Sequence, residues 1–379
     1  MKKKIAIIAG EASGDLQGAL LARHLYSLEP ALEIFGVGGP RMKNERVRLL
    51  YDSSEWGAVG FREGLLRVPG LWMKIVRLKR TLLSERPDIL VLIDSPAINM
   101  RLAKFARKHR LNRVYYFPPS AWSRDPGRAR RIAAIVGNVI ATFPVTVSTY
   151  AEAGVKAAFF GHPIVDYIGD VGSTENIRKK MELPEGKRLI GLLPGSRTQE
   201  IQALLLPLLG AAEIILRAIP EAHFVIPAAT PALLPMIHSF ISGSSLPVTV
   251  LDGSSHDVMR VSELLLTSSG TATLEAACLG TPMVVIYRLP RMDWFLAKIF
   301  VHVPCVALPN LILGKKVLPE LLQDQVTPAN IAACALEILT DPQRKEAIKE
   351  ELNRVRSSLG EAGVVEKVAR YILELSANA

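Results

Sequence analysis

Cysteine and long unbroken apolar runs are scarce in this chain of 379 residues, and their scarcity excludes several kinds of protein. The three cysteines, Cys278, Cys305 and Cys334, are too few and too scattered for a disulfide scaffold or a four-ligand metal site, and they fit a reducing compartment. Residues 132–151 and 222–251 carry no Asp, Glu, Lys or Arg, but glycine or proline interrupts both stretches. A membrane-spanning helix needs about 20 mostly apolar residues without such breaks, so we expect strand–turn–helix segments and a soluble or peripheral protein.

Several sequence signatures are also missing. No Gly-x-Gly-x-x-Gly follows the first apolar run, so a dinucleotide cofactor is not expected. No helix-turn-helix, zinc-finger or RNA-recognition signature appears, which argues against sequence-specific nucleic-acid binding. No Asp-x-Asp pair stands in a plausible metal position, so we expect no metal either. The apolar run at the start is too short for a secretory signal peptide, because charge returns at Glu11.

Positive charge is in excess. Lysine and arginine number 46 against 36 acidic residues, which gives a net charge of +10. This excess favours anionic partners such as a membrane surface or a phosphorylated substrate. The length predicts two or three domains, and 49% hydrophobic with 22% charged residues is typical of globular proteins.

Short apolar runs alternate with longer amphipathic segments. In the first half, the expected buried strands are Ile5–Ala9, Ile34–Val37, Ile89–Ile93, Val114–Phe117 and Val139–Ala141. The series restarts with Leu189–Leu193, Phe224–Pro227, Val248–Leu251, Leu264–Leu266 and Met283–Ile286. Continuous β-branched runs separated by helical patterns predict doubly wound α/β domains with parallel sheets.

The domain boundaries follow from the same pattern. Glycine, proline and aspartate collect between Gly161 and Ser173, where the first series ends. We predict two facing Rossmann-like domains, residues 1–165 and 166–340, with a cleft between them. Residues 341–379 carry alternating charge and leucine without a strand signal, and they predict a helical C-terminal tail.

The first strand runs into a glycine turn, Gly10-Glu11-Ala12-Ser13-Gly14-Asp15. Backbone N–H groups at such a turn can hold an anion. Asp15 would repel phosphate there, which favours a hydroxyl-bearing ligand. The alternative is that Ser13 and Asp15 only cap a tight turn.

Two further strand ends carry candidate ligand-binding residues. In open α/β sheets, ligands bind beyond the carboxyl ends of the strands, so Asp94 is well placed as a general base. The alternative is that Asp94 or Ser95 caps the next helix. After the following strand, Trp122 and Arg124, with more arginines close behind, suit an anionic sugar-like or lipid-like ligand. The alternative for this segment is a solvated basic helix face.

Two turns in the second half also join a strand to a helix, at Pro194–Arg197 and at Thr267–Glu275. Free N–H groups at a helix start suit a diphosphate, and an arginine can add a bidentate contact. An acid one turn into the helix lies within reach of ribose hydroxyls. The candidate nucleotide contacts are Arg197, Ser269, Gly270, Thr271, Thr273 and Glu275. The alternative is that both turns are purely structural.

Residues 61–83 read FREGLLRVPGLWMKIVRLKRTLL. Apolar residues, among them Leu66 and Trp72, alternate with six basic ones, among them Arg77, Lys79 and Arg80, and with a single acid. A basic, apolar, tryptophan-bearing segment with a Pro-Gly break suits the interface of an anionic membrane. The alternative is an ordinary amphipathic helix packed on the sheet.

Eight motifs occur together and in order, and together they resemble the lipid-A-disaccharide synthases. The motifs are GEASGD, GVGGPRM, Asp94-Ser95-Pro96, FFGHP, LLPGSR, SSGTATLE, PMVVIYR and LPNLILG. The resemblance covers Ile5 to about Leu375. It implies a GT-B fold, in which the first domain faces the acceptor and the membrane and the second holds the UDP-sugar.

The resemblance also implies a reaction and its residues. UDP-2,3-diacylglucosamine and 2,3-diacylglucosamine 1-phosphate (lipid X) would give a β-1,6 disaccharide and UDP, with inversion and without a metal. The implied setting is a homodimer that is peripheral on the cytoplasmic face of the inner membrane. Asp94 matches the family's essential aspartate, Arg197 the arginine of its PGSR motif and Asn310 the asparagine of its LPN motif. The resemblance thereby adds Asn310 to the expected contacts of the UDP-sugar. Ala97 and Ser123 depart from the family pattern, which affects the expected preference for acceptor or acyl chain.

Two other functions fit the same residues. A UDP-sugar epimerase of this fold would act without an acceptor and would not need the segment 61–83. A non-catalytic protein that binds sugar nucleotides at a membrane surface would fit if Asp94 were only a cap.

Overall fold

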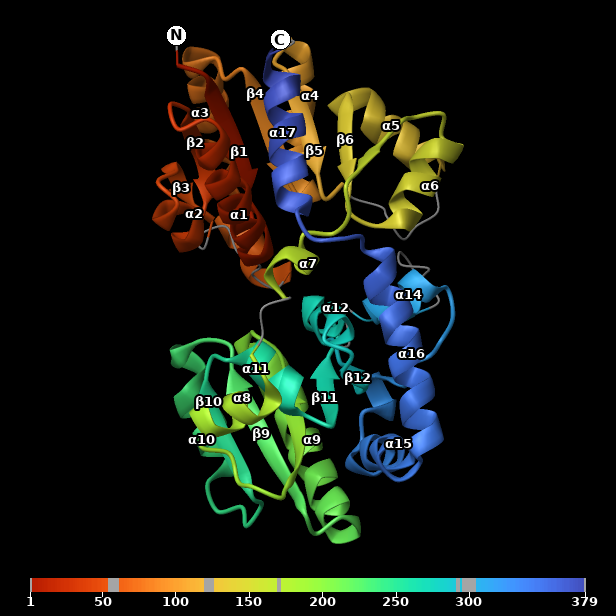
Figure 1. The fold of residues 1–379 in the computed structure, drawn as a ribbon. Coiled ribbons are helices and arrows are strands. Elements are labelled where there is room, and N and C mark those ends of the chain that lie inside the picture. Colours follow the sequence, from red (N-terminus) through yellow and green to blue (C-terminus); the bar gives the residue numbers. More distant parts are fainter. Residues whose placement is uncertain are drawn as a thin grey trace. The chain divides into compact units, whose positions relative to one another are not determined.

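The computed structural model describes residues 2–53, 61–118, 126–168, 172–290, 294 and 305–377; the side chains of residues 12, 61–72, 126 and 128 are not described. The chain forms two compact units. Unit 1 comprises Met1–Asp166 with Leu359–Ala379, and unit 2 comprises Tyr167–Ser358. Each unit is built on one parallel sheet flanked by helices (Figure 1), which confirms the predicted doubly wound α/β class.

The sheet of unit 1 has the strand order β3-β2-β1-β4-β5-β6-β7. Its strands are β1 (Lys4–Ala9), β2 (Glu33–Gly38), β3 (Arg48–Asp52), β4 (Ile89–Ile93), β5 (Arg113–Tyr116), β6 (Asn138–Ala141) and β7 (Ala158–Phe159). The order reverses between β1 and β4, and such a reversal opens a crevice beyond the carboxyl ends of the two strands. No apolar run predicted β3 or β7, because β3 is only half-buried at the sheet edge and β7 has two residues.

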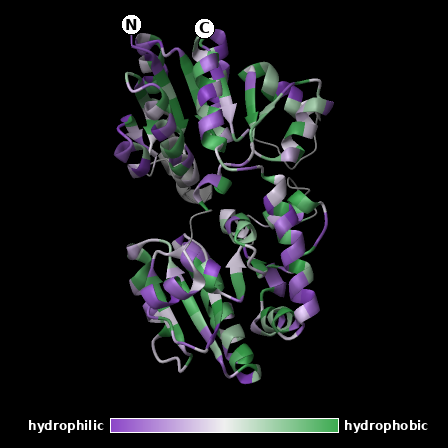
Figure 2. Cartoon of the chain, in the orientation of Figure 1, coloured by the Kyte–Doolittle hydropathy of each residue, from purple (hydrophilic) through white to green (hydrophobic). Residues whose placement is uncertain are grey.

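Side chains of β1 alternate between two buried faces. Ile5 and Ile7 join the cluster beneath α1 (Ala12–Leu28) and α17 (Val364–Ala377). Ala6 and Ile8 join the cluster on the opposite face. The helices there are α3 (Phe61–Glu85), α4 (Pro96–Lys108) and α5 (Pro126–Val136). Burial on both faces explains why this strand has no polar alternation in the sequence, and Figure 2 shows the strands as largely hydrophobic.

The C-terminal tail is helical but is shared between the units. The helices α15 (Pro328–Thr340) and α16 (Pro342–Ser358) belong to unit 2. The last helix, α17, lies beside α1 in unit 1 (Figure 1), where Val368 and Ile372 are fully buried. The predicted separate tail over 341–379 therefore divides near Leu359.

The Asp166 carboxylate connects the two segments of unit 1, near the points where the chain leaves this unit and returns to it. Asp166, the last residue of the first segment of unit 1, accepts hydrogen bonds from the backbone N–H groups of Gly363, Val364 and Val365 at 2.7, 3.1 and 2.7 Å. These groups open α17, so Asp166 acts as its N-terminal cap across almost 200 residues of sequence. The sequence pattern offered no sign of this long-range contact.

The sheet of unit 2 has the order β10-β9-β8-β11-β12-β13. Its strands are β8 (Arg188–Leu193), β9 (Ala222–Ala228), β10 (Val248–Asp252), β11 (Leu264–Ser268), β12 (Met283–Tyr287) and β13 (Glu320–Leu322). The helices α9 (Thr198–Ala218) and α15 pack together on one face, and α8 (Thr174–Lys180) and α11 (Ser255–Val261) cover the other. The strand order repeats that of unit 1, so β11 occupies the place in its sheet that β4 occupies in the first.

The uncharged stretches have the structures that the sequence predicts. Residues 132–151 contain β6 between two helices, and residues 222–251 contain β9 and β10 around α10 (Leu234–Ile241). Among the described residues, one helix is long and apolar enough to cross a membrane, namely α9. Its side chains Leu204, Leu208 and Ile215 are buried, and the helix packs on α15, which is the behaviour of a core helix.

Candidate functional site

Asp94 and Ser95 follow β4 at the crevice between β1 and β4. Both residues adopt the left-handed conformation, with φ of 48° and 44°. Such a conformation costs about 1–3 kcal/mol for a residue other than glycine, and it is found where the surroundings enforce it. Among the described residues, Ser95 makes no side-chain cap to α4, so its predicted alternative as a helix cap is not supported.

Two buried side chains hold this strained turn. The Asn99 Nδ2 group donates to the carbonyl oxygens of Ile93 and Asp94 at 2.9 and 2.8 Å. The Tyr115 hydroxyl donates to the Asp94 carbonyl oxygen at 2.5 Å. Asn99 is fully buried, and buried polar groups that are hydrogen-bonded stabilise one local geometry. Neither residue was predicted as part of the site; the only signal was that Asn99 ends the stretch Asp94–Asn99.

The turn after β1 approaches the turn after β4. A Cβ atom on Gly10 would lie 2.6 Å from Ser95 Oγ, so a larger residue here would displace the Ser95 side chain. Burial raises the pKa of Asp94, the negative charge of Glu11 raises it further, and the Ser95 backbone N–H partly opposes both. A carboxylate whose pKa is shifted towards the working pH is a better general base than an ordinary surface carboxylate.

Asp15 has a structural role in the neighbouring turn. Its Oδ1 accepts hydrogen bonds from the backbone N–H groups of Gly39 and Met42 at 2.6 and 3.0 Å, and its Oδ2 accepts one from Arg41 at 3.1 Å. These groups open α2 (Pro40–Asn44), so Asp15 is a buried cap. The alternative of a cap is therefore favoured over contact with a ligand hydroxyl. Ser13 is exposed in the first turn of α1.

In unit 2, the turn after β8 is occupied by a carboxylate of the protein itself. Glu200 Oε2 accepts hydrogen bonds from the backbone N–H groups of Ser196 and Arg197 at 2.8 and 3.2 Å. Glu200 Oε1 pairs with Arg197 Nη1 at 3.2 Å. The Arg197 side chain is 60% exposed and can exchange this surface pair for another anion. Glu200 was not predicted as a site residue, although an acid at the third position of a helix is a known capping signal.

The turn after β11 is open by comparison. α12 (Thr271–Cys278) begins after Gly270, whose φ of 158° and ψ of −161° favour glycine. No described side chain caps this helix start. Thr271 is exposed, whereas Thr273 is buried and its hydroxyl donates to the Gly270 carbonyl at 2.8 Å. The first-turn N–H groups therefore suit an anion, and Thr273 shapes the turn from inside.

Glu275 lies on α12 one turn beyond this opening. Its Oε2 lies 3.4 Å from His256 Nε2 on α11, and its side chain is 16% exposed. The remaining acceptor capacity of the carboxylate suits ribose hydroxyls. His256 was not predicted, because it lies on a different helix and no local motif marks it.

Asn310 is fully buried in α14 (Leu308–Leu313) and bonds to Glu320 and to nearby backbone groups. The sequence predicted contact between Asn310 and the sugar nucleotide. In the structure this side chain is buried and hydrogen-bonded within the protein.

Several residues that were predicted to contact the acceptor or the membrane lie outside the part of the chain that the structure describes. Trp122 and Arg124 lie outside the described residues, and so do the side chains of Leu66 and Trp72. The helix α3 runs without interruption through the Pro-Gly pair, so the predicted break is wrong.

The described half of α3 has two distinct faces. Ile75 and Leu78 are buried on the sheet, as in an ordinary amphipathic helix. Arg77 and Arg80 are exposed on the outer face. Lys79 is half-buried, with its ammonium 5.3 Å from the Phe105 ring centroid. This half of the helix therefore combines packing on the core with a basic surface.

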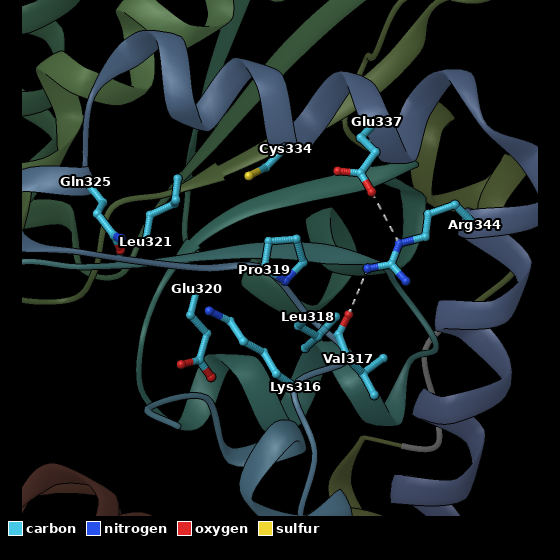
Figure 3. Close-up of a pocket in the computed structure, with 10 residues that line it drawn as sticks. All are labelled: Lys316, Val317, Leu318, Pro319, Glu320, Leu321, Gln325, Cys334, Glu337 and Arg344. Carbon is cyan, nitrogen blue, oxygen red and sulfur yellow. Dashed lines mark hydrogen bonds and ion pairs between the residues drawn. The ribbon is translucent and has the colours of Figure 1, made fainter. Parts of the chain in front are cut away.

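A pocket of about 350 Å³ lies in unit 2 beside β13 and α15 (Figure 3). Arg344 lies at its edge, 3.7 Å from the Glu337 carboxylate and 3.5 Å from the Val317 carbonyl oxygen. The described lining contains none of the predicted nucleotide contacts. The pocket is therefore separate from the turn after β11.

Relatives of known name match almost the whole chain. A family model described as lipid-A-disaccharide synthetase matches residues 5–373. The lipid-A-disaccharide synthase of Geobacter sulfurreducens is 37% identical over 372 residues, which cover 98% of this chain and 97% of that protein. The lipid-A-disaccharide synthase of Trichlorobacter lovleyi is 36% identical over 373 residues, with the same coverage of 98% and 97%.

Solved structures of low sequence identity share the fold. The Staphylococcus aureus MnaA–UDP co-structure has a TM-score of 0.67 at 16% identity and covers 98% of this chain and 97% of that one. The UDP-GlcNAc 2-epimerase of Neisseria meningitidis bound to UDP-GlcNAc has a TM-score of 0.65 at 14% identity, covering 98% and 100%. The glycotransferase of kitacinnamycin has a TM-score of 0.66 at 15% identity, covering 99% of each chain.

The two kinds of comparison carry different weight. The likeness to these solved structures lies at low identity and shows the GT-B fold alone. The family model and the curated relatives extend over nearly all of the sequence and confirm the resemblance that its motifs predict. The chain belongs to the lipid-A-disaccharide synthase family, whose members are glycosyltransferases that act as hexosyltransferases.

Proposed function

We propose that this protein transfers 2,3-diacylglucosamine from UDP to the 6-hydroxyl of 2,3-diacylglucosamine 1-phosphate, with inversion at the anomeric carbon. The observation that carries the proposal is the carboxylate of Asp94, partly buried at the end of β4, in a turn held by Asn99 and Tyr115. Its raised pKa suits a base that works near neutral pH.

In this mechanism, Asp94 takes the proton of the acceptor hydroxyl while the oxygen attacks the anomeric carbon opposite UDP. The new C–O bond forms as the bond between the anomeric carbon and the phosphate oxygen breaks. The bonding electron pair leaves with UDP, and the proton remains on Asp94 until solvent removes it. A single displacement of this kind inverts the configuration.

Unit 2 would stabilise the leaving diphosphate. Negative charge increases on UDP as the bond breaks. The backbone N–H groups of Thr271 and Ala272, which open α12, favour that charge. Arg197 would exchange Glu200 for a phosphate oxygen. Glu275 would accept hydrogen bonds from the ribose hydroxyls.

We further propose that unit 1 lies on an anionic membrane surface, because both substrates carry acyl chains. Arg77 and Arg80 on α3 are exposed, and the outer face of the neighbouring α4 adds further basic side chains. The exposed basic residues of α4 are Arg101, Lys104, Arg107 and Lys108. Residence on the cytoplasmic face of the inner membrane and a homodimeric state remain predictions from the family.

Vesicle flotation tests the membrane contact. Changing Arg77, Lys79 and Arg80 together to glutamine should weaken binding to anionic vesicles by up to about 3 kcal/mol, since each basic residue contributes about 1 kcal/mol near such a surface. Salt near 1 M should reduce the binding of the parent in the same direction. The matched control changes Arg178, Lys179 and Lys180 in unit 2 and should float like the parent. Equal flotation of both triple variants would refute the contact.

A direct assay tests the reaction. The protein is incubated with UDP-2,3-diacylglucosamine, with and without the monosaccharide phosphate. Transfer predicts UDP and disaccharide only when both substrates are present. An epimerase would change the donor without the acceptor, and a binding protein would release no UDP in either mixture.

A further inference from the structure

A buried cluster in unit 2 joins α14, β13 and the segment before α14. It consists of the side chains of Asn310 and Glu320 with the backbone of residues 306–307 and 317–318. Asn310 is fully buried and Glu320 is 6% exposed. Polar side chains buried to this extent are costly unless their hydrogen bonds are satisfied, so the pattern of bonds indicates what the cluster does.

Every hydrogen-bonding group of the Asn310 side chain is used inside the protein. Its Nδ2 donates to the carbonyl oxygen of Leu318 at 3.0 Å and to Glu320 Oε1 at 2.8 Å. Its Oδ1 accepts from the backbone N–H groups of Val317 and Leu318, both at 2.9 Å. An amide has two donors and two good acceptor positions, so Asn310 has nothing left to offer a nucleotide.

Glu320 continues the cluster towards the segment before α14. Its Oε2 accepts from the Val306 backbone N–H at 3.0 Å, and its Oε1 accepts from that of Ala307 at 3.0 Å. With the bond from Asn310, three donors converge on one carboxylate. Glu320 is also among the residues that line the pocket, and Figure 3 shows its carboxylate directed away from Cys334.

The segment fixed by Glu320 reaches the open turn before α12. The Ser269 hydroxyl donates to the Val306 carbonyl oxygen at 2.9 Å, and the Ser269 backbone N–H donates to Ile286 on β12 at 3.1 Å. Val306 therefore lies between two bonded partners: its N–H contacts Glu320 and its carbonyl contacts Ser269. Any shift of Val306 would be transmitted directly to the residue preceding Gly270.

We propose that Asn310 and Glu320 are positioning residues, which act through Val306 and Ser269 to set the turn that binds the diphosphate, and that Asn310 does not touch the sugar nucleotide. The proposal rests on the proposed function, because it takes the turn before α12 as the UDP site. It changes the role of the asparagine of the LPN motif from ligand contact to internal support.

The test compares UDP affinity by calorimetry in folded variants. E320Q keeps the shape of the side chain but sets an amide N–H against a backbone N–H, so UDP should bind about tenfold more weakly, as for loss of a buried hydrogen bond. The matched control is E263Q. Glu263 is also a bonded carboxylate, 2.8 Å from Arg188 and 2.7 Å from Lys345, but it precedes β11, whereas Ser269 follows that strand. E263Q should lower the melting temperature and leave UDP affinity unchanged.

Exchanging the amide of Asn310 and the carboxylate of Glu320 distinguishes a positioning role of Asn310 from direct contact with the nucleotide. N310D places a second carboxylate against Glu320 and should weaken UDP binding more than E320Q does. The double variant N310D/E320Q again pairs an amide with a carboxylate and should recover part of the lost affinity. A direct contact between Asn310 and the nucleotide predicts no recovery, and that result would overturn the proposal.

Ser269 tests the connection between the cluster and the turn. S269A removes the bond to Val306 and should weaken UDP binding, and adding E320Q to S269A should cause little further loss. Fully additive losses, or unchanged affinity in folded E320Q, would overturn the proposal while the UDP site stands. Failure of the parent to bind UDP would instead remove the proposed function, and the positioning role with it.

Discussion

The turns after β4 and β11 occupy equivalent places in two sheets of the same strand order, yet they carry opposite chemistry. The turn after β4 holds a carboxylate in a left-handed conformation, and buried Asn99 and Tyr115 bind its backbone. The turn after β11 has glycine in its strained position and leaves the helix start open. One turn suits the uptake of a proton, and the other suits the binding of negative charge.

This contrast shows that one topological position can carry residues suited to two kinds of chemistry. Each turn follows the strand next to the reversal of strand order in its own sheet, so the fold supplies the position. The residues of each turn decide the chemistry: Asp94, directly after β4, presents a carboxylate that repels a phosphate, whereas Ser269 and Gly270 after β11 carry no charge. Each of the following variants alters one side of this contrast, and each has a control at the opposite end of the same strand or helix.

Asp94→Asn should have the largest effect. Turnover should fall by about 10²–10⁴, as is usual when a general base is lost, while UDP affinity stays near that of the parent. Asp88→Asn alters a carboxylate at the other end of β4, 2.7 Å from the Lys4 backbone nitrogen, and should keep most of the turnover. Near-parental turnover in Asp94→Asn would remove Asp94 from the mechanism.

The same variant should also be more stable than the parent at neutral and alkaline pH. The pKa of Asp94 is raised in the folded protein, so ionisation of this group opposes folding as the pH rises through that pKa. The gain in melting temperature should vanish at low pH, where the parent carboxyl is also protonated. Asparagine tolerates the left-handed conformation, so the turn is kept.

Gly270→Ala should have the next largest effect. A side chain disfavours the observed φ and ψ by about 1–3 kcal/mol, so the helix start should reorganise and UDP should bind several-fold to a hundredfold more weakly. Gly280→Ala is the control, because it imposes similar strain at φ of 73° after the other end of α12. It should reduce stability and spare UDP binding. Equal UDP affinity in the two variants would show that the turn after β11 is not the diphosphate site.

Glu11→Gln should have the smallest effect. Glu11 raises the pKa of Asp94, so neutralising it should lower that pKa and move the acidic limb of the kcat/KM profile to lower pH. Glu29→Gln, at the far end of α1, should leave the profile in place. A shift of the limb to higher pH in Glu11→Gln would contradict the assignment of this limb to Asp94.

The sequence predicted features that depend on neighbouring residues. The ten apolar strands, the glycine turns and the position of Asp94 at a strand end all follow from local pattern, and all lie where expected. The hydrogen-bonding partners of Asp15 and Asn310 were not predictable in this way. Each has hydrogen-bonding partners in another turn or strand, and the identity of a polar residue does not show whether it faces a ligand or a backbone N–H group.

The Asp166 cap of α17 has a consequence for synthesis of the chain. Its partners, Gly363 to Val365, lie 197 to 199 residues further along, and the helix that they open completes the buried core of unit 1. Unit 2 is complete in sequence at Ser358, before that helix emerges from the ribosome. The unit that begins first is therefore the last to close, and one face of its sheet is covered only by α1 until α17 has been made.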